Sequence, residues 1–376
     1  MLAYWIWLAA CKGLGNKQKL ELVARFGDVR RLWEAEDYSA HCLPPAAVKS
    51  LTDKDLTAAQ QTLHRCAQLG IQVVTAGEAR FPRRLLALVD PPLVLYYKGT
   101  WPDFDREAAV AVVGTRRASA YGLMASERVG RQLARHGGLV VSGMAAGIDA
   151  QAAWGAIHAG RPTVAVLGCG VDIIYPAENR PLYEEILRFG CVLSEYPPGT
   201  KGSSWSFPQR NRIVSGLSVA VLAVEAPEKS GTMITARLAL EQGKALYVVP
   251  GHIDSEFCAG SNALLRDGAR VATSGWDILR EYEAQFPDKL HGTVQDTPVR
   301  QPSAPAAAEP APKQVNFSGV TAEEQKLLEP LLAGERTVDD LIAVSGLAPQ
   351  KALAMLTMLE LKGMVTTLPG RRVTLS

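Results

Sequence analysis

The sequence is poor in the residues that build disulfide-linked or metal-linked scaffolds. It has six cysteines in 376 residues, at positions 11, 42, 66, 169, 191 and 258, and no two of them form a Cys-x-x-Cys pair. The histidines near them do not repeat a zinc-ligand spacing, so we expect no metal site. Dispersed thiols in a chain of this length indicate a reduced, cytoplasmic protein whose cysteines are mostly buried.

A strong net charge and long apolar runs are also missing. The apolar stretch Met1–Cys11 lacks a basic start and is too short to span a bilayer, so we expect no membrane segment. The formal net charge is +2, which excludes a polycation. A nucleic-acid site would therefore have to be a local patch of positive charge.

Four regions differ in their residue pattern. Residues 1–70 show helical periodicity, and residues 71–284 alternate short β-branched runs with helices and glycine turns. Residues 285–318 are rich in Pro, Ala and polar residues, a composition that cannot bury a core and predicts an extended linker. Residues 319–376 have the pattern of three helices and a hairpin tipped by Pro369-Gly370, which predicts a winged helix.

The second region predicts the fold class. Its apolar runs are nearly continuous and are separated by helical segments, as in a parallel sheet covered on both faces. We expect an α/β protein with an extended Rossmann-like parallel sheet, preceded by a small helical domain and followed by the winged helix. The expected strands are Ile71–Thr75, Leu93–Tyr97, Ala109–Val113, Leu139–Val141, Thr163–Leu167, Val219–Glu225 and Ala245–Val249.

A glycine turn, Lys12–Lys17, precedes an amphipathic helix that runs to Phe26 in the first region. A turn of this kind, flanked by lysines, can hold a DNA backbone, as in helix-hairpin-helix or SAM-like domains. An ordinary turn between two helices explains the pattern equally well. Both interpretations stay open at this point.

The turn after the Ala109–Val113 strand contains candidate phosphate ligands, namely Gly114, Thr115, Arg116 and Arg117. Backbone amides at the end of a parallel strand and at the start of the next helix favour an anion. The two arginines can bind phosphate through paired hydrogen bonds. The motif is neither G-x-G-x-x-G nor a Walker loop, so it predicts phosphate contact without predicting a nucleotide cofactor.

Two further strand-to-helix turns carry hydroxyls and amides that can donate to phosphate. The expected ligands in them are Ser142, Gly143 and Gly147 in the first, and Lys229, Ser230, Gly231 and Thr232 in the second. In the first turn we expect Asp149 to satisfy helix-start amides rather than to act as a base. In the second, capping of the helix by Ser230 or Thr232 is the alternative.

A fourth segment combines basic and aromatic residues, the mixture that binds phosphates and stacks on bases. Its candidate DNA ligands are Lys201, Phe207, Arg210, Asn211 and Arg212. In a helix begun at Pro208, Arg210 and Arg212 point about 200° apart, so we expect them not to share a ligand. Phe207 is either a stacking platform for a base or a core residue.

These segments together resemble the DprA/Smf family of bacterial DNA-processing proteins. The motifs that carry the resemblance occur in order and include Phe81-Pro82, Asp90–Gly99, Val113–Arg116, Ser142–Asp149, Ala165–Gly168, Tyr175–Asn179, Ser194–Pro197, Phe207–Arg212, Ser230–Ala236 and Val249–Gly251. The resemblance implies an extended Rossmann fold that binds single-stranded DNA, loads the RecA recombinase during natural transformation and forms a homodimer. The residues at matching positions are Arg116, Ser142, Gly143, Phe207, Arg210 and Ser230, and Lys201 is a near match.

The chain departs from the family pattern at one position, and one class of enzymes is an alternative to this family. Members of the family commonly have a histidine after the Gly-Ile-Asp segment, where this chain has Ala153 and Trp154. The rival resembles lysine-decarboxylase-like phosphoribohydrolases, whose glutamate drives glycosidic cleavage. This chain has Thr235 at that position, so we expect no catalytic residue, no cofactor and no enzymatic activity.

The predicted recognition helix of the winged region, Pro349–Leu361, is apolar and holds one lysine and one glutamate. A helix that reads the major groove normally carries several basic or amide side chains. A contact with protein, or a purely structural role, fits this region better. Its basic cluster is Arg371-Arg372, at the expected wing.

Overall fold

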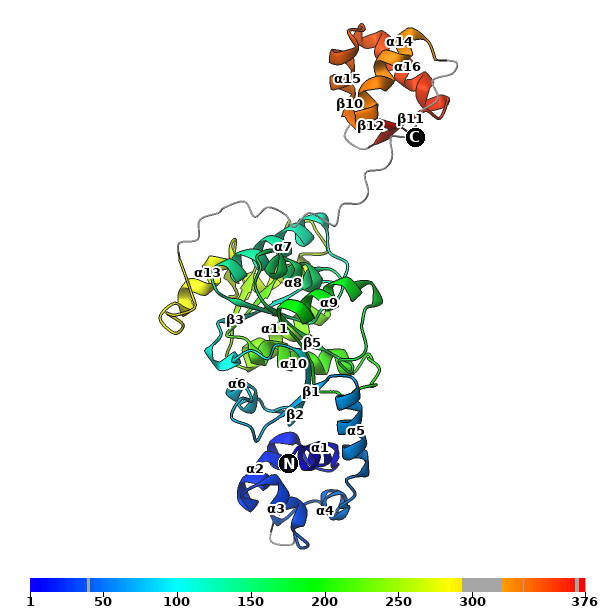
Figure 1. Cartoon of the computed structure of the whole chain (residues 1–376). Coiled ribbons are helices and arrows are strands. Elements are labelled where there is room, and N and C mark those ends of the chain that lie inside the picture. Colours follow the sequence, from blue (N-terminus) through cyan, green and yellow to red (C-terminus); the bar gives the residue numbers. More distant parts are fainter. Residues whose placement is uncertain (39–40, 293–319, 334, 369–371, 376) are drawn as a thin grey trace. The chain divides into compact units, whose positions relative to one another are not determined.

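The computed structural model describes the chain except for residues 39–40, 293–319, 334, 369–371 and 376. The chain divides into two compact units, Met1–Val299 and Arg300–Ser376 (Figure 1). The first unit holds the sheet that was expected to carry the site, and the second holds the predicted winged helix.

A nine-stranded sheet with the order β1-β2-β6-β5-β4-β3-β7-β8-β9 forms the centre of the first unit. All seven expected strands are present, and β6 and β9 are additional. The strands from β6 to β9 in this order are mutually parallel, whereas β1 and β2 are antiparallel and extend the sheet beyond β6. Their bounds are β1 Gln72–Thr75, β2 Val94–Gly99, β3 Ala109–Val113, β4 Leu139–Ser142, β5 Thr163–Leu167, β6 Cys191–Ser194, β7 Ala220–Ala223, β8 Ala245–Val248 and β9 Arg270–Val271.

Helices cover both faces of this sheet, and the central strands β3, β4, β5 and β7 are buried at every position. In β3, Val110 and Val112 share a core cluster with α7, α8 and α13, and Ala109, Ala111 and Val113 share another with α6, α10 and α11. The helices are α6 Arg83–Leu86, α7 Ala120–Arg135, α8 Ile148–His158, α9 Arg180–Phe189, α10 Ser206–Leu217, α11 Gly231–Glu241, α12 Ala259–Arg266 and α13 Gly275–Leu279. Short 3-10 turns occupy η2 Phe104–Arg106, η3 Ala177–Asn179 and η4 Arg280–Tyr282. The predicted α/β class is confirmed.

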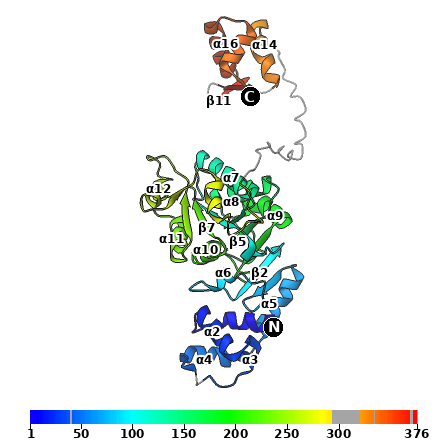
Figure 2. The same cartoon turned by 90° about the vertical axis from the view of Figure 1, so that its left-hand side faces the viewer.

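The N-terminal helices gather beside the β1–β2 end of the sheet (Figure 2). They are α1 Leu2–Ala10, α2 Asn16–Phe26, α3 Val29–Glu34, α4 Pro45–Thr52 and α5 Thr57–Gln68. Trp5 and Leu8 of α1 belong to the same core cluster as Tyr96 of β2 and Leu167 of β5, so helices and sheet share one core. In the Lys12–Lys17 turn, a Cβ on Gly13 would lie 2.6 Å from the backbone nitrogen of Ala47, which shows that this turn packs closely against α4.

The end of the first unit differs from the expectation. The linker was predicted to begin at residue 285, but Phe286 and Leu290 are buried in the core cluster of α7 and α13. Lys289 forms an ion pair with Glu107 at 2.5 Å. The packed chain therefore continues at least to Gly292, because two apolar side chains within a polar stretch are enough to anchor it. The rest of the predicted linker lies outside the described residues.

The second unit has the predicted order of helix, helix, longer helix and hairpin. It consists of α14 Ala322–Leu328, η5 Glu329–Ala333, β10 Arg336–Thr337, α15 Val338–Ser345, α16 Pro349–Leu361, β11 Val365–Leu368 and β12 Arg372–Leu375. The short strand β10, which was not predicted, pairs with β12 and completes a three-stranded sheet of order β10-β12-β11. Leu327, Leu341, Leu359 and Val373 are among its core residues. Within the described residues of the chain, no single helix has the length and apolarity to cross a membrane.

Candidate nucleic-acid interface

A cleft of about 510 Å³ opens at the carboxyl ends of β3 and β7. The chain runs from β3 through β4 and β5 to β6 on one side and through β7 to β9 on the other, so the strand order reverses here. Open α/β sheets bind their ligands at such a reversal. Eleven of the sixteen predicted ligands line the cleft, namely Gly114, Thr115, Arg116, Arg117, Phe207, Arg210, Asn211, Lys229, Ser230, Gly231 and Thr232.

Three exposed cations give this cleft its charge. Arg116, Arg117 and Lys229 are exposed and line the wall. Within the described part of the chain, none of the three forms an ion pair with a carboxylate. Among the lining residues the one carboxylate is Asp149, which is buried. The cleft therefore presents positive charge to a ligand in an otherwise nearly neutral protein.

Arg210 lies beneath the cleft floor and is buried. Its Nη1 donates to the carbonyl oxygen of Gly143 at 2.8 Å and also to that of Val166, and its Nε donates to Asn211 Oδ1 at 3.1 Å. A Cβ on Gly143 would lie 2.5 Å from the guanidinium, so glycine is required there. Burial raises the pKa of Asp149, and the charge of Arg210 and the Gly143 N–H oppose this rise. Arg210 thus stabilises the loop after β4 and leaves little of its own charge for a ligand.

Arg212 does not reach this cleft. Its Nη2 donates to both carboxylate oxygens of Glu195, at 2.8 and 2.6 Å, and its Nε lies 3.3 Å from Asp90 Oδ2. It lines a different cavity, on the side of α10 that faces the N-terminal helices. Arg210 and Arg212 therefore contact different partners, as their helical spacing indicated. The proposal that Arg212 contacts DNA at this cleft is not supported by its position.

The start of α7 is occupied by a carboxylate of the chain itself. Glu225, which follows β7 and is buried, accepts hydrogen bonds from the backbone nitrogen of Ser119 at 2.9 Å and from its hydroxyl at 2.5 Å. The Thr115 N–H donates to the Glu225 carbonyl oxygen at 2.8 Å. Amides of this turn and helix start were expected to attract phosphate. Glu225 takes two of these N–H groups, those of Thr115 and Ser119, and places a carboxylate beside the helix start, so the arginine side chains are the stronger phosphate ligands of this turn.

The start of α11 is open by contrast. The Ser230 hydroxyl accepts from the Met233 N–H at 3.4 Å, which caps the helix as the alternative interpretation proposed. Among the described residues, no protein acceptor faces the backbone N–H groups of Gly231 and Thr232. Both residues line the cleft next to Lys229, and a helix N-terminus favours an anion. Of the three strand-to-helix turns predicted to bind phosphate, this one places both a cation and the first N–H groups of a helix at the cleft.

Four predicted ligands besides Arg212 lie outside the cleft wall. Ser142 is buried, and its hydroxyl donates to the Val112 carbonyl oxygen at 2.7 Å, so it holds β4 to β3. Gly143 lies behind Arg210. Gly147 has φ +81°, and a Cβ there would lie 2.5 Å from the Thr115 carbonyl oxygen, so it allows the two loops to pack together. Lys201 is exposed in the loop before α10 but is not part of the wall.

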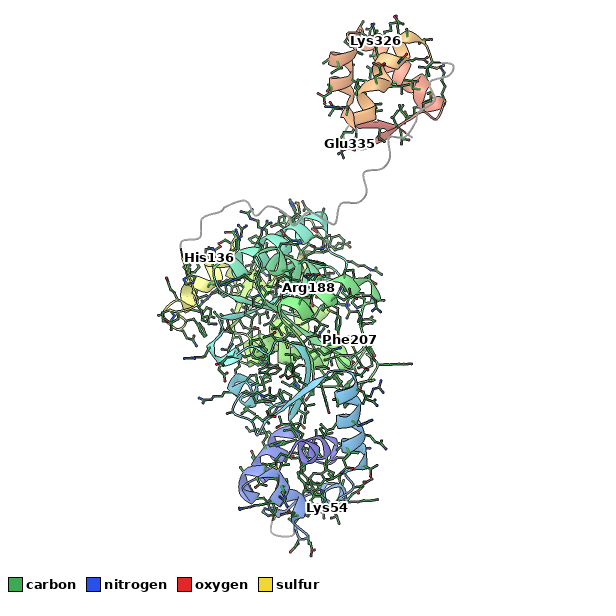
Figure 3. The ribbon with its side chains drawn as sticks, in the orientation of Figure 1. Lys54, His136, Arg188, Phe207, Lys326 and Glu335 are labelled. Carbon is green, nitrogen blue, oxygen red and sulfur yellow. The ribbon has the colours of Figure 1, made fainter. Side chains whose placement is uncertain are left out.

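Phe207 lies in a stack of three side chains, and Figure 3 marks it among the side chains of the sheet region. The Arg116 guanidinium lies 5.3 Å from the Phe207 ring centroid, and the Tyr175 ring stacks at 4.9 Å with an interplanar angle of 30°. A Cβ on Gly168 would lie 2.6 Å from Phe207 Cδ1. The ring is half-buried and closely packed, and it also lines the cleft. Phe207 therefore has features of a core residue and of a stacking platform for a base, and it positions Arg116 and Tyr175.

Sequence reasoning missed several residues at this site. Tyr175 is 44% exposed, and its motif had been noted without a role. Phe257, which is 41% exposed, lines the cleft from the loop before α12, and no local pattern marked it. The role of Glu225 could have been suspected, because it ends an apolar run, and an acidic residue is seldom fully buried without a partner. Thr235 also lines the cleft, and its hydroxyl donates to the Gly231 carbonyl oxygen at 3.2 Å.

Comparison with known proteins identifies the family. Residues 72–283 match the family described as DNA recombination-mediator protein A, and residues 301–371 match the DprA winged helix domain. Protein Smf of Synechocystis sp. is 32% identical over 388 residues, with 98% of each chain covered. The chain belongs to the DprA/Smf family. The resemblance inferred from the ordered motifs is confirmed, and this DprA/Smf chain is a DNA-processing protein with a winged-helix domain.

Other DprA proteins agree with this assignment. The DNA processing protein DprA of Bacillus subtilis is 36% identical, over 63% of this chain and 80% of its own. The crystal structure of DprA from Streptococcus pneumoniae is 32% identical and superimposes with a TM-score of 0.65, covering 75% of this chain and 98% of that one. DprA of Helicobacter pylori, whose structure describes a single-stranded DNA binding mode, is 32% identical with a TM-score of 0.50 over 58% of this chain and 98% of its own.

Proposed function

We propose that the cleft at the carboxyl ends of β3 and β7 binds single-stranded DNA through its phosphates, with little preference for sequence. The observation that carries the proposal is the group of three exposed cations, Arg116, Arg117 and Lys229, which have no carboxylate partner among the described residues and lie beside the start of α11. Phosphate contacts dominate nucleic-acid affinity and carry no sequence information directly. The single-stranded DNA binding of the Helicobacter pylori relative supports the same function.

The aromatic side chains favour a single strand over a duplex. Phe207 and Tyr175 stack beside the cations, and Phe257 lines the same cleft. Bases can stack on such rings when they are unpaired, whereas a duplex keeps its bases inside. A protein that reads a duplex presents a helix or a β-ribbon to a groove. The cleft instead lies between loops, which suits a flexible strand.

The winged helix contributes little to this binding in our proposal. Lys351, Lys362 and Arg372 pair with Glu323, Glu324 and Glu335 at 2.6, 2.7 and 2.7 Å. The hydrogen bond from Lys362 and those from Thr321 lower the pKa of Glu324 to about 2, so that pair stays charged at neutral pH. Cations neutralised in this way release few counterions from DNA. A protein contact or a structural role remains the proposed use of this domain.

The family supports two further proposals. A recombination mediator transfers a bound strand to a recombinase, so we expect the DNA-bound protein to load RecA and to act as a homodimer. The first expectation is tested by RecA filament assembly on DNA that this protein covers, which is measured through the ATPase activity of RecA. Sedimentation equilibrium tests the second, and a monomer at micromolar concentration contradicts it.

Binding of labelled oligonucleotides across a salt series tests the main proposal. We expect tighter binding to single strands than to duplexes of the same length, with affinity that falls as salt rises. Equal affinity for duplexes, or an affinity that salt does not change, contradicts the proposal. Incubation with purine nucleoside monophosphates tests the enzymatic alternative, for which release of free base is the positive result.

A further inference from the structure

A second cavity, of about 450 Å³, lies between the N-terminal helices and the sheet. Side chains of α1, α5, β2 and α10 and of the loop after β6 line it. Most of the wall is apolar and includes Ile6, Ala58, Leu93, Tyr196 and Trp205. The volume and the mixture of apolar walls with a few polar groups are typical of sites for small organic groups.

The polar groups of this cavity include an incompletely satisfied arginine. Arg212 is 8% exposed, and its Nη1 has no hydrogen-bond acceptor among the described residues, whereas its Nε lies 3.3 Å from Asp90 Oδ2. A buried donor without an acceptor is costly, so it is expected to meet one in a bound molecule. Glu195 and Asp90 lie beside it and can accept hydrogen bonds from the same molecule. The wall thus presents donors and acceptors close together.

The charge of the cavity excludes phosphate. Its lining carries three carboxylates, those of Asp55, Asp90 and Glu195, against the single guanidinium of Arg212. An anionic group would be repelled from such a site, and a neutral group with both donors and acceptors would not. A nucleobase has this chemistry, because its faces are apolar and its edge carries N–H groups and carbonyl oxygens.

The cavity and the DNA cleft lie on two sides of the start of α10. Ser204 and Pro208 line the cleft, whereas the next residues in sequence, Trp205 and Gln209, line the cavity. The Trp205 side chain is 65% exposed, although it is a large aromatic group. A DNA strand that leaves the cleft therefore needs to cross only the first turn of α10 to bring a base to the cavity.

We propose that this cavity binds one unstacked nucleobase of the strand whose phosphates lie in the cleft. The inference rests on the proposed function, and it assigns the N-terminal helices a part in holding DNA. The base enters edge first, so that its carbonyl oxygen accepts from Arg212 and its N–H groups donate to Glu195 or Asp90. Its phosphate stays outside, and Trp205 and Tyr196 contact its faces.

The test fills the cavity without changing its charged groups. Ala58 is exposed on α5 and lines the cavity, so Ala58→Trp places an indole where the base would lie. Ala67→Trp is the matched control, because Ala67 is also exposed on α5 and lies nine residues later, about 180° around the helix. Both full-length variants are compared with the parent by melting temperature to show that they fold.

Two measurements are made with an oligonucleotide that carries 5-iodouracil, which on irradiation links covalently to an aromatic side chain in contact with it. We expect the parent and Ala67→Trp to give cross-links at Tyr196, which lines the cavity, and at Phe207, which lines the cleft, or Tyr175, which stacks on Phe207. Ala58→Trp should lose the Tyr196 cross-link and keep the others. Its affinity should fall by at least about fivefold, the lower value for one stacked base, with an unchanged salt slope.

The outcomes separate this inference from the proposed function. Cross-links in the cleft without any at Tyr196 in the parent protein overturn the inference and leave the function standing. An Ala58→Trp protein that keeps the Tyr196 cross-link and the parent affinity also overturns it. Failure of the parent to bind or cross-link the oligonucleotide at any of these residues overturns the proposed function itself.

Discussion

The charge of the cleft makes a quantitative prediction about salt. Arg116, Arg117 and Lys229 are exposed, line the cleft and have no carboxylate partner among the described residues. Replacing all three by alanine removes the cations that can neutralise phosphate and leaves the buried Arg210 in place. Exposed side chains of this kind usually change stability by about 0.5 kcal/mol or less, so the variant should fold.

The expected magnitude comes from the number of contacts. Each phosphate neutralised on a single strand contributes about −0.7 to the slope of log affinity against log salt. Three contacts contribute about −2, so the triple variant should have a slope shallower by about 2. Between 50 and 200 mM salt, the affinity of the parent should then fall about 20-fold more than that of the variant.

Fluorescence anisotropy with a labelled oligonucleotide of mixed sequence measures the slope at five or more salt concentrations. Arg237→Ala is the matched control, because Arg237 is an exposed arginine on α11 that pairs with Glu241 and lies outside the cleft. The control should keep the parent slope. A triple variant with the parent slope would refute the assignment of phosphate binding to this cleft, and an equal change in the control would refute its specificity.

Three further predictions concern the packing around the site. Gly168→Ala should push the Phe207 ring out of its stack, because the new Cβ would lie 2.6 Å from Phe207 Cδ1, and anisotropy should show an affinity loss of at least about fivefold at an unchanged salt slope. Glu225→Gln should lower the free energy of unfolding by about 1–3 kcal/mol, because a buried charged acceptor at the start of α7 is lost, and urea denaturation with an unchanged midpoint would contradict this. A chain that ends after residue 292 should keep its DNA affinity. A chain that ends after residue 284 should be less stable, because the loss of buried Phe286 and Leu290 should each lower the free energy of unfolding by about 2–5 kcal/mol. Equal melting temperatures of the two truncated chains would show that this segment is not part of the core.

The strands of the sheet could be predicted from the sequence where every residue of the strand is buried. Ala109–Val113 was predicted with the bounds that β3 has, because both of its faces are covered and all five residues are apolar. The strand Cys191–Ser194 was missed, since it depends on pairing with β5 and β2, and its short apolar run does not indicate these partners. Arg270–Val271 pairs over two exposed residues and leaves no apolar pattern. Short strands of this kind depend on their neighbours for their existence.

The site was predictable as a group of loops and less so as a set of side chains. Glycines and arginines after parallel strands indicated the cleft, and Arg116, Arg117 and Lys229 do line it. The direction of a side chain depends on partners that are distant in sequence. Arg212 forms ion pairs with Asp90 and Glu195, and the Ser142 hydroxyl donates a hydrogen bond to the Val112 carbonyl oxygen of the neighbouring strand. None of these partners could be recognised before the fold was known.

The carboxylate of Glu225 at the start of α7 has a consequence for selectivity. Cells contain high concentrations of free nucleotides, and the first strand-to-helix turn of a Rossmann-like sheet is where their phosphates usually bind. Here a fixed negative charge already lies at that position and would repel them. Free ATP or NAD should consequently be a poor competitor for the protein. A long strand, which can reach the neighbouring cations through several phosphates at once, would still be captured in the presence of that pool.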